Sequence, residues 1–191
     1  VIRVTLCGEH ASWPASVVVP LFLPDLPVFL RWRGPLGTSD GERELVESVD
    51  RLVVDSSECP DLAFEFAELA SVLDTVVVSD IAWARALPWR EAVAQLWPEV
   101  ADAATVRVAG PEADALLLAG WLSSRLGREV ELEHEPAGEI ELVEVDGRQA
   151  QPDRADTRSP ADLLSDQLDV FSRDRVYEEA VRRAARETAR A

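Results

Sequence analysis

Short runs of β-branched and aliphatic residues alternate, over the first two thirds of the chain, with segments whose apolar residues recur at helical spacing. The strand candidates are 1–7, 27–32, 51–55, 75–79 and 105–109. The helical candidates are 60–73, a second stretch that runs to Trp97, and 111–126. Pro88 interrupts the second stretch and is expected to restart the helix there. Strands that alternate with helices need crossover connections, so the sequence predicts an α/β fold with a mostly parallel sheet and helices on both faces.

The last third has a different pattern. Residues 129–135 and 139–145 alternate acidic and apolar side chains, which predicts an antiparallel hairpin with one solvated face at the sheet edge. Residues 147–159 are polar and rich in Asp, Arg, Gln and Pro, as in a linker. The expected organisation is an α/β domain over 1–146, a linker over 147–159, and a helical tail over 160–191 that packs on the domain or on a partner.

The helix predicted over 111–126 is apolar almost all round, so it must be covered on more than one side. Gly127 is placed to cap its C-terminus. Gly120, inside the helix, lowers helix propensity, and we expect it to allow close approach of a neighbouring element.

Charge and hydropathy exclude several classes of function. The 191 residues include 36 acidic and 19 basic ones, a net charge of -17, and such a surface repels nucleic-acid phosphates and anionic membranes. The apolar runs are too short to cross a bilayer, and residues 1–4 read as a strand rather than a signal peptide. We expect a cytoplasmic protein that binds neither nucleic acid nor membrane; homo-oligomerisation stays open.

Motifs for enzymatic chemistry are missing from the sequence. The turn at 8–13 has one glycine and an acidic residue, and neither a phosphate-binding glycine motif nor a GxSxG elbow occurs. Two cysteines and two histidines are too few for a zinc site. We read Cys59 as a small, partly buried cap residue rather than an activated thiol, and His10 as a surface imidazole rather than a general base. The sequence therefore predicts a protein without cofactor, metal or catalytic residues.

Two strand ends carry polar pairs, Asp55-Ser56 and Ser79-Asp80. Ligands of α/β sheets bind at this edge, so these residues are candidates for a small-molecule or partner site. Asp and Ser also cap helices and form turns, and we favour that interpretation. The alternative function for the chain is a small-molecule sensor or degenerate enzyme that uses Asp55 and Asp80.

Tryptophan is unusually frequent, with six residues, three of them within 81–97. Trp and Arg dominate binding hot spots when they meet at a surface. The same residues could form a tryptophan-rich core whose arginines reach outwards to solvent. Both interpretations stay open.

This segment carries a family resemblance. Residues 80–85, followed by Trp89-Arg90, resemble the D-x-A-W-A-R…W-R signature of the OpcA family, the glucose-6-phosphate dehydrogenase assembly proteins of actinobacteria and cyanobacteria. Three further segments, 18–28, 51–56 and 119–127, resemble other motifs of the family and occur in the same order as in the family. The resemblance is to the C-terminal domain of the family, whose additional N-terminal domain is expected to lie outside this chain. Arg31 departs from it, since an aromatic residue is expected there beside Trp32.

The resemblance implies a non-catalytic partner that promotes assembly or activity of glucose-6-phosphate dehydrogenase through protein–protein binding. The residues expected to contact the enzyme, or to support the contacts, are Trp32, Trp83, Arg85, Trp89 and Arg90.

Overall fold

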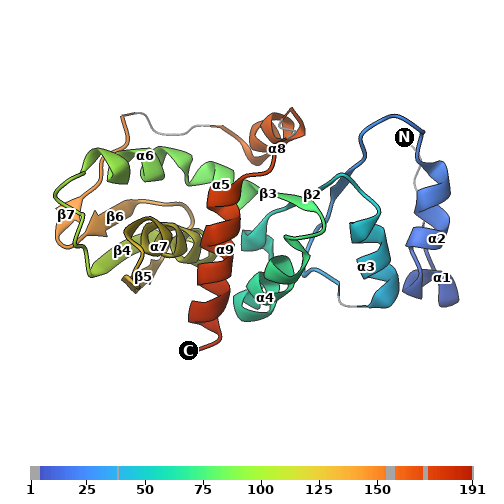
Figure 1. The fold of residues 1–191 in the computed structure, drawn as a ribbon, viewed down its shortest axis with the longest axis horizontal. Helices are drawn as coiled ribbons and strands as arrows, with labels where there is room; N and C mark the ends of the chain where they lie inside the picture. Colours follow the sequence, from blue (N-terminus) through green and yellow to red (C-terminus); the bar gives the residue numbers. More distant parts are fainter. Residues whose placement is uncertain (1–4, 38, 154–157, 170–171, 191) are drawn as a thin grey trace.

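A computed structural model describes residues 5–37, 39–153, 158–169 and 172–190, and its strands form two sheets (Figure 1). The first sheet is parallel, with the order β1 (Phe29–Arg31), β2 (Arg51–Val54) and β3 (Val77–Asp80). The second is mixed, with the order β5 (Glu131–Pro136), β4 (Thr105–Gly110), β6 (Leu142–Val145) and β7 (Arg148–Gln149). The predicted α/β class is confirmed, although the strands are divided between two sheets.

Helices separate and cover these sheets. In chain order they are α1 (Glu9–Ser12), α2 (Ala15–Val18), the 3-10 turn η1 (Val19–Leu21), α3 (Asp40–Glu47), the 3-10 turn η2 (Ser56–Glu58), α4 (Leu62–Val72), α5 (Ile81–Arg85), α6 (Leu87–Gln95), α7 (Glu112–Leu126), α8 (Pro160–Leu168) and α9 (Arg175–Thr188). The helix predicted over 60–73 is α4, which begins at Leu62 because Asp61 caps it. The predicted restart near Pro88 is the break between α5 and α6.

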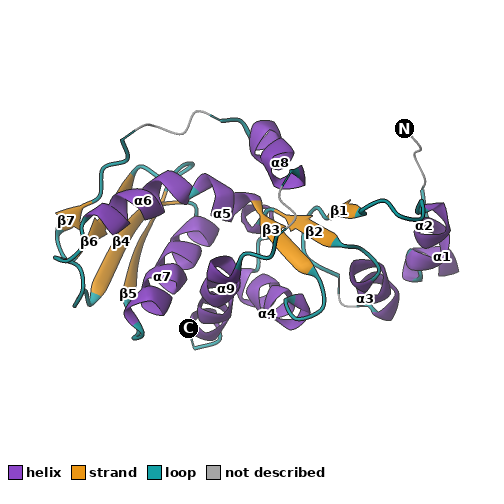
Figure 2. Ribbon diagram, turned by 45° about the horizontal axis from the view of Figure 1, so that its top comes forward, coloured by secondary structure: helices purple, strands orange, loops and turns teal. Residues whose placement is uncertain are grey.

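The first sheet has helices on both faces. Leu52 and Val78 point into a core that α4 and α9 close with Phe66 and Tyr177. Side chains alternate along a strand, so Val53 points to the other face, where it packs against Leu163 of α8. Figure 2 shows α8 above this sheet, with α4 and α9 below it.

α7 joins the two cores, which explains its apolar surface. Leu116 and Leu117 belong to the core of the first sheet, whereas Leu118 and Leu122 belong to that of the second. The close approach expected at Gly120 is confirmed, since a Cβ there would lie 2.5 Å from the carbonyl oxygen of Ala180 in α9. Gly127, with φ of 68°, caps α7 in the left-handed conformation, as predicted.

The predicted pairing of 129–135 with 139–145 is wrong. β5 lies parallel to one side of β4 and β6 lies antiparallel to its other side, so these strands do not pair with each other. The apolar strand β4, with Val106 and Val108 buried, takes the centre of the sheet and separates them. The antiparallel edge hairpin is β6–β7 instead, through a turn at Asp146 and Gly147, both with positive φ. The predicted linker therefore begins inside this hairpin.

The N-terminal arm, 5–28, differs from the prediction as well. Residues 5–7 form no strand, and residues 1–4 of the predicted strand lie outside the described part of the chain. The apolar stretch from Ser16 is helical in α2 and η1, and the arm lies beside α3 at one end of the molecule (Figure 1). None of the helices in the described ranges has the length and apolarity to span a membrane.

Candidate functional site

The two predicted strand ends meet at one edge of the first sheet. Asp80 ends β3 beside Val54, the residue before Asp55, and Asp80 is only 1% exposed. Its Oδ1 accepts hydrogen bonds from the backbone N–H groups of Ser56 (3.1 Å) and Ala82 (2.9 Å). The side chain of Asp55 accepts one from the N–H of Ser57. The capping roles favoured from the sequence are therefore confirmed.

The environment of Asp80 disfavours its charge. Burial, together with the neighbouring carboxylate of Asp55, raises the pKa of Asp80 to about 6. The N–H donors of Ser56 and Ala82 oppose both effects. Asp80 is thus a buried carboxyl group that titrates in the mildly acidic range.

The side chain of Arg85 lies between Asp55, at this edge of the first sheet, and Asp114 of α7. Its Nε and Nη2 donate to the two carboxylate oxygens of Asp114, at 2.9 Å and 2.7 Å, in a bidentate pair. Asp55 lies 4.0 Å from the same guanidinium. The side chain of Asp114 is fully buried in the first turn of α7, whereas that of Arg85 is 25% exposed. Arg85 therefore ties the strand ends to α7 and presents only part of its side chain to solvent.

Trp83 and Arg90 lie in direct contact. Trp83 is 6% exposed, packs on Tyr177 with ring centroids 5.7 Å apart, and donates from Nε1 to Asp174 at 2.8 Å. The guanidinium carbon of Arg90 lies 3.2 Å from the centre of the indole, and Nη2 donates to the carbonyl of Trp83. Burial lowers the pKa of Arg90 to about 10. Trp83 is thus part of the core, and Arg90 covers it.

The other two predicted residues lie apart. Trp89 of α6 is half-buried against the core of the second sheet. Trp32 follows β1, at the opposite edge of the first sheet from β3, and its Nε1 donates to the carbonyl of Pro35 at 2.9 Å. The structure therefore brings Trp83, Arg85 and Arg90 close in the fold, around α5, but places Trp32 elsewhere.

His10 and the thiol of Cys59 match the favoured interpretations, but the expected capping of the 60–73 helix by Cys59 is wrong, because Asp61 caps α4 and Cys59 ends η2. Cys59 is 6% exposed, and burial, the largest cause, raises the pKa of its thiol, which does not activate it as a nucleophile. His10 is exposed on α1.

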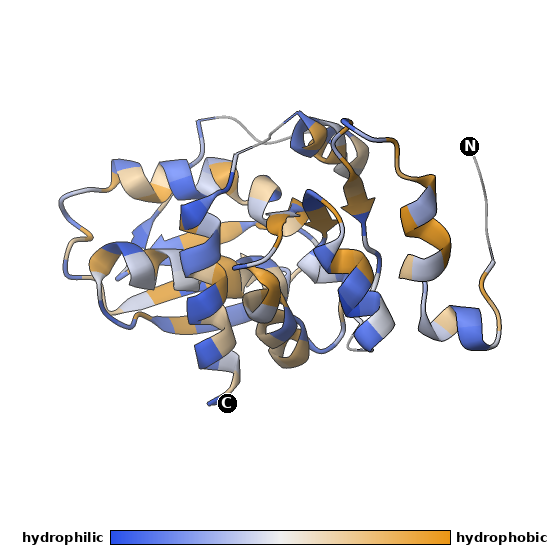
Figure 3. Cartoon of the chain, turned by 45° about the vertical axis from the view of Figure 1, so that its right-hand side comes forward, coloured by the Kyte–Doolittle hydropathy of each residue, from blue (hydrophilic) through white to orange (hydrophobic). Residues whose placement is uncertain are grey.

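Two features went unnoticed in the sequence. The first is a set of exposed apolar residues on the N-terminal arm, parts of which have the hydrophobic colour in the ribbon of Figure 3. They are Trp13, Leu21, Leu23 and Leu26, between 49% and 65% exposed. The apolar run broken by prolines was the available signal, but periodicity does not tell which residues find a neighbour.

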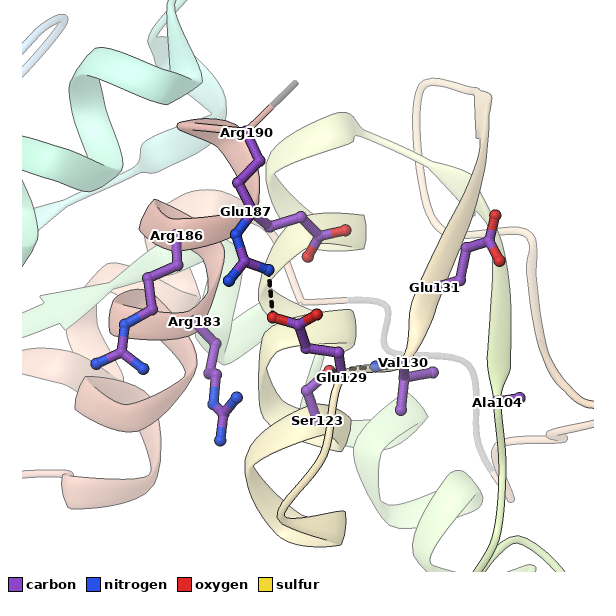
Figure 4. A pocket seen from close by; sticks show the side chains of 9 residues that line it. All are labelled: Ala104, Ser123, Glu129, Val130, Glu131, Arg183, Arg186, Glu187 and Arg190. Carbon is purple, nitrogen blue, oxygen red and sulfur yellow. Dashed lines mark hydrogen bonds and ion pairs between the residues drawn. The ribbon is translucent and has the colours of Figure 1, made fainter.

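The second is a groove of about 790 Å³ between α9, the end of α7 and the start of β5 (Figure 4). Arg183 and Arg186 line it from α9, and Arg190 pairs with Glu129. Burial raises the pKa of Glu187, with the charge of Glu129 adding to the effect. The groove thus mixes both signs of charge.

Comparison with known proteins gives two family matches. A model described as the C-terminal domain of a glucose-6-phosphate dehydrogenase subunit matches residues 76–181, and one described as the N-terminal domain of the same subunit matches residues 1–71. The N-terminal match corrects the expectation that this domain lies outside the chain. Because β1 and β2 fall in one match and β3 in the other, both segments contribute to a single sheet.

Two curated proteins are similar to the chain, and both carry the provisional name OxPP cycle protein OpcA. The protein of Synechococcus elongatus is 29% identical over 161 residues, which cover 76% of this chain and 36% of that protein. The protein of Nostoc punctiforme is 24% identical over 155 residues, covering 74% and 33%. The chain thus spans about a third of the length of these relatives.

Proposed function

Because the chain belongs to the OpcA family, we propose that it is a non-catalytic partner of glucose-6-phosphate dehydrogenase and promotes the assembly or activity of that enzyme by binding it. The observation that carries this proposal is the pair of family matches. They are described as the N-terminal and C-terminal domains of a glucose-6-phosphate dehydrogenase subunit, and together they cover most of the chain. An effector of this kind works by binding one state of the enzyme more tightly than another.

The contact residues of this proposal are the partly exposed ones around α5 and α6, together with Trp32. Arg85, Trp89 and Arg90 each keep part of their side chain accessible. Trp83 is a supporting residue in this proposal, because its buried ring holds the guanidinium of Arg90 in place. Arginine and tryptophan are the residue types that contribute most to binding when they are held rigidly at a surface.

The N-terminal arm is a second candidate surface for docking to the enzyme. Its exposed apolar side chains (Trp13, Leu21, Leu23 and Leu26) follow one another within 14 positions of the sequence. Apolar side chains grouped on a surface are typical of sites that bind other proteins.

The proposal is tested with the dehydrogenase of the same organism. Its rate of NADP reduction is measured with and without this chain, and co-elution of the two proteins is measured by size-exclusion chromatography. We expect a complex and an increase in the rate or in the assembled fraction of the enzyme. Unchanged kinetics together with separate elution would contradict the proposed function.

Matched variants identify the surface. Trp89→Ala is compared with Trp97→Ala, a change of the same side chain at a position that is 62% exposed and lies outside the proposed set. Loss of a hot-spot tryptophan weakens binding by about 2 kcal/mol, or about thirtyfold. If the double variant Leu23→Ser/Leu26→Ser weakens the complex and Trp89→Ala does not, the contacts lie on the arm and the assignment of Trp89 is wrong.

A further inference from the structure

A second, smaller cavity of about 340 Å³ lies between β3, α5, α6, α8 and the start of α9. Arg51, Ser79, Arg90 and Asp174 contribute polar groups to its wall, and Trp83 and Leu87 contribute apolar surface. Gln167 of α8 also lines it, and it shares no lining residue with the groove of Figure 4. This cavity is small, and arginine dominates its charged groups.

Arg51, which is buried, and Arg90, which is partly exposed, have no paired carboxylate in the described part of the chain. Arg51 is 4% exposed, and its guanidinium donates to the hydroxyl of Ser79 and to the carbonyl of Ser172. Arg90 donates to the carbonyl of Trp83, while its Nε is buried and has no hydrogen-bond partner in the described part of the chain. Within the described ranges, neither guanidinium forms an ion pair with Asp or Glu.

The carboxylate in the wall is already engaged. Asp174 accepts hydrogen bonds from Trp83 Nε1 at 2.8 Å and from the N–H groups of Val176 and Tyr177 at 2.9 Å and 3.0 Å. It attracts the charge of Arg90 from a distance without forming a direct bond to it. A charge that is wholly or partly removed from water and lacks a counter-charge is costly, so two positive groups around one small cavity favour an anion there.

We propose that this cavity binds a phosphate group carried by a small metabolite, held between the guanidinium groups of Arg51 and Arg90. Arginine donates in a planar fork that matches the oxygens of a phosphate, and two guanidinium groups balance the charge of a phosphate monoester. The free Nε of Arg90 supplies a donor, and the hydroxyl of Ser79 lies in the same wall. The volume falls in the range of small-ligand sites. This site goes beyond partner binding and does not depend on it.

Phosphate binding would also act on α9. Arg51 bonds to Ser172 before this helix, and Arg90 lies on Trp83, whose indole bonds to the capping residue Asp174. An anion that fixes both guanidinium groups would therefore hold the start of α9 in its observed position.

The test uses the 191-residue chain and inorganic phosphate as the probe. Calorimetric titration and thermal unfolding are measured with phosphate, with succinate, and with sodium chloride at equal ionic strength. We expect phosphate to bind and to raise the melting temperature more than chloride does. Equal effects of phosphate and chloride would overturn the proposal, and binding of succinate without phosphate would overturn the assignment of the ligand class.

Variants separate the cavity from general charge effects. Arg90→Gln and Arg51→Gln are each expected to weaken phosphate binding by about tenfold or more, because each removes charge-assisted hydrogen bonds. The matched control is Arg186→Gln, which removes the same charge from a position in the groove of Figure 4 and should leave the affinity within about twofold. Equal weakening by all three variants would overturn the site.

A measurement on the unaltered chain covers the case in which a buried-arginine variant does not fold. The indole N–H resonance of Trp83 is assigned by its absence in Trp83→Phe and is followed by NMR during a phosphate titration. Because Arg90 lies on this ring, we expect a saturable shift of the resonance. A resonance that stays fixed at saturating phosphate would contradict binding in this cavity.

Discussion

The hydroxyl group of Tyr177 donates a hydrogen bond to Oδ2 of Asp80 at 3.3 Å and joins α9 to the end of β3, although the two residues are 97 positions apart. Both residues are 1% exposed. Since Oδ1 of Asp80 accepts from Ser56 and Ala82, one carboxyl group connects the loop after β2, the start of α5, and α9. A titratable group therefore lies where three parts of the fold meet.

Replacing Asp80 by Asn should flatten the pH dependence of stability. The pKa of Asp80 is about 6 in the folded chain and about 3.9 when unfolded, so its protonated form stabilises the fold fully below pH 4. That contribution, about 3 kcal/mol, is lost as the pH rises through 6. We expect Asp80→Asn to match the parent near pH 4 and to exceed it at pH 8 by a similar amount, measured by urea unfolding.

The comparison across pH provides its own control, because other carboxylates titrate equally in both proteins. An advantage of Asp80→Asn that is the same at pH 4 and pH 8 would contradict the assigned ionisation.

Removing the hydroxyl of Tyr177 should destabilise the chain and shift the same titration. Tyr177→Phe loses a hydrogen bond to the carboxylate, which costs about 1–3 kcal/mol in a buried site. Donation to a carboxylate favours its charged form, so the pKa of Asp80 should rise further in the variant. Urea unfolding gives the first quantity, and NMR titration of the Asp80 carboxyl carbon gives the second. A lowered pKa would argue against the donor role of Tyr177.

Much of the first core could be predicted from the sequence because its signals are local. The spacing of Phe66 and Leu69 predicts α4, and Gly127 marks the end of α7, since each depends on neighbours along one helix. The same reasoning predicts that Asp55 and Asp80 cap the helical turns directly after them. Their meeting with Arg85 and Asp114 involves distant segments, which no local pattern contains.

The pair of Arg85 and Asp114 should behave as a coupled unit. Arg85→Met leaves the fully buried carboxylate of Asp114 without its bidentate partner, which costs about 3–5 kcal/mol. Replacing both residues, with Asp114→Leu as the second change, removes the buried charge, so the double variant should lose less than the sum of the single losses by about 2 kcal/mol. A double-mutant cycle in urea measures this difference. Losses that add within about 0.5 kcal/mol would contradict the coupling.

The close contact between α7 and α9 should not tolerate a methyl group. Gly120→Ala would place a Cβ 2.5 Å from the backbone oxygen of Ala180, so the two helices must separate, at a cost of about 2 kcal/mol or more. Gly138→Ala is the matched control, because its Cβ would meet nothing within 4 Å, and it should change stability by less than about 0.5 kcal/mol. Thermal unfolding compares the two variants. Equal melting temperatures would show that α9 does not approach α7 this closely.

The pairing of the strands β5 and β6 with β4 could not be predicted from the sequence, for a physical reason. Residues 129–135 and 139–145 alternate apolar and acidic residues, and this pattern reports one wet face for each strand but not the identity of its neighbour. Val106 and Val108 supply the apolar centre that both strands cover from opposite sides. The burial of Trp83 could not be predicted from local sequence either, because its partners Tyr177 and Asp174 lie about 90 positions further along the chain.

The sharing of one sheet between the two family segments has a consequence for biosynthesis. Phe66 and Leu69 in α4 pack in a cluster with Tyr177 and Val181, so the nascent chain exposes this apolar surface until the ribosome has released α9. A polypeptide cut between residues 71 and 76 would separate β2 from β3 and α4 from α9. Each fragment would then expose apolar surface that the intact chain buries, so the core of the first sheet needs both segments.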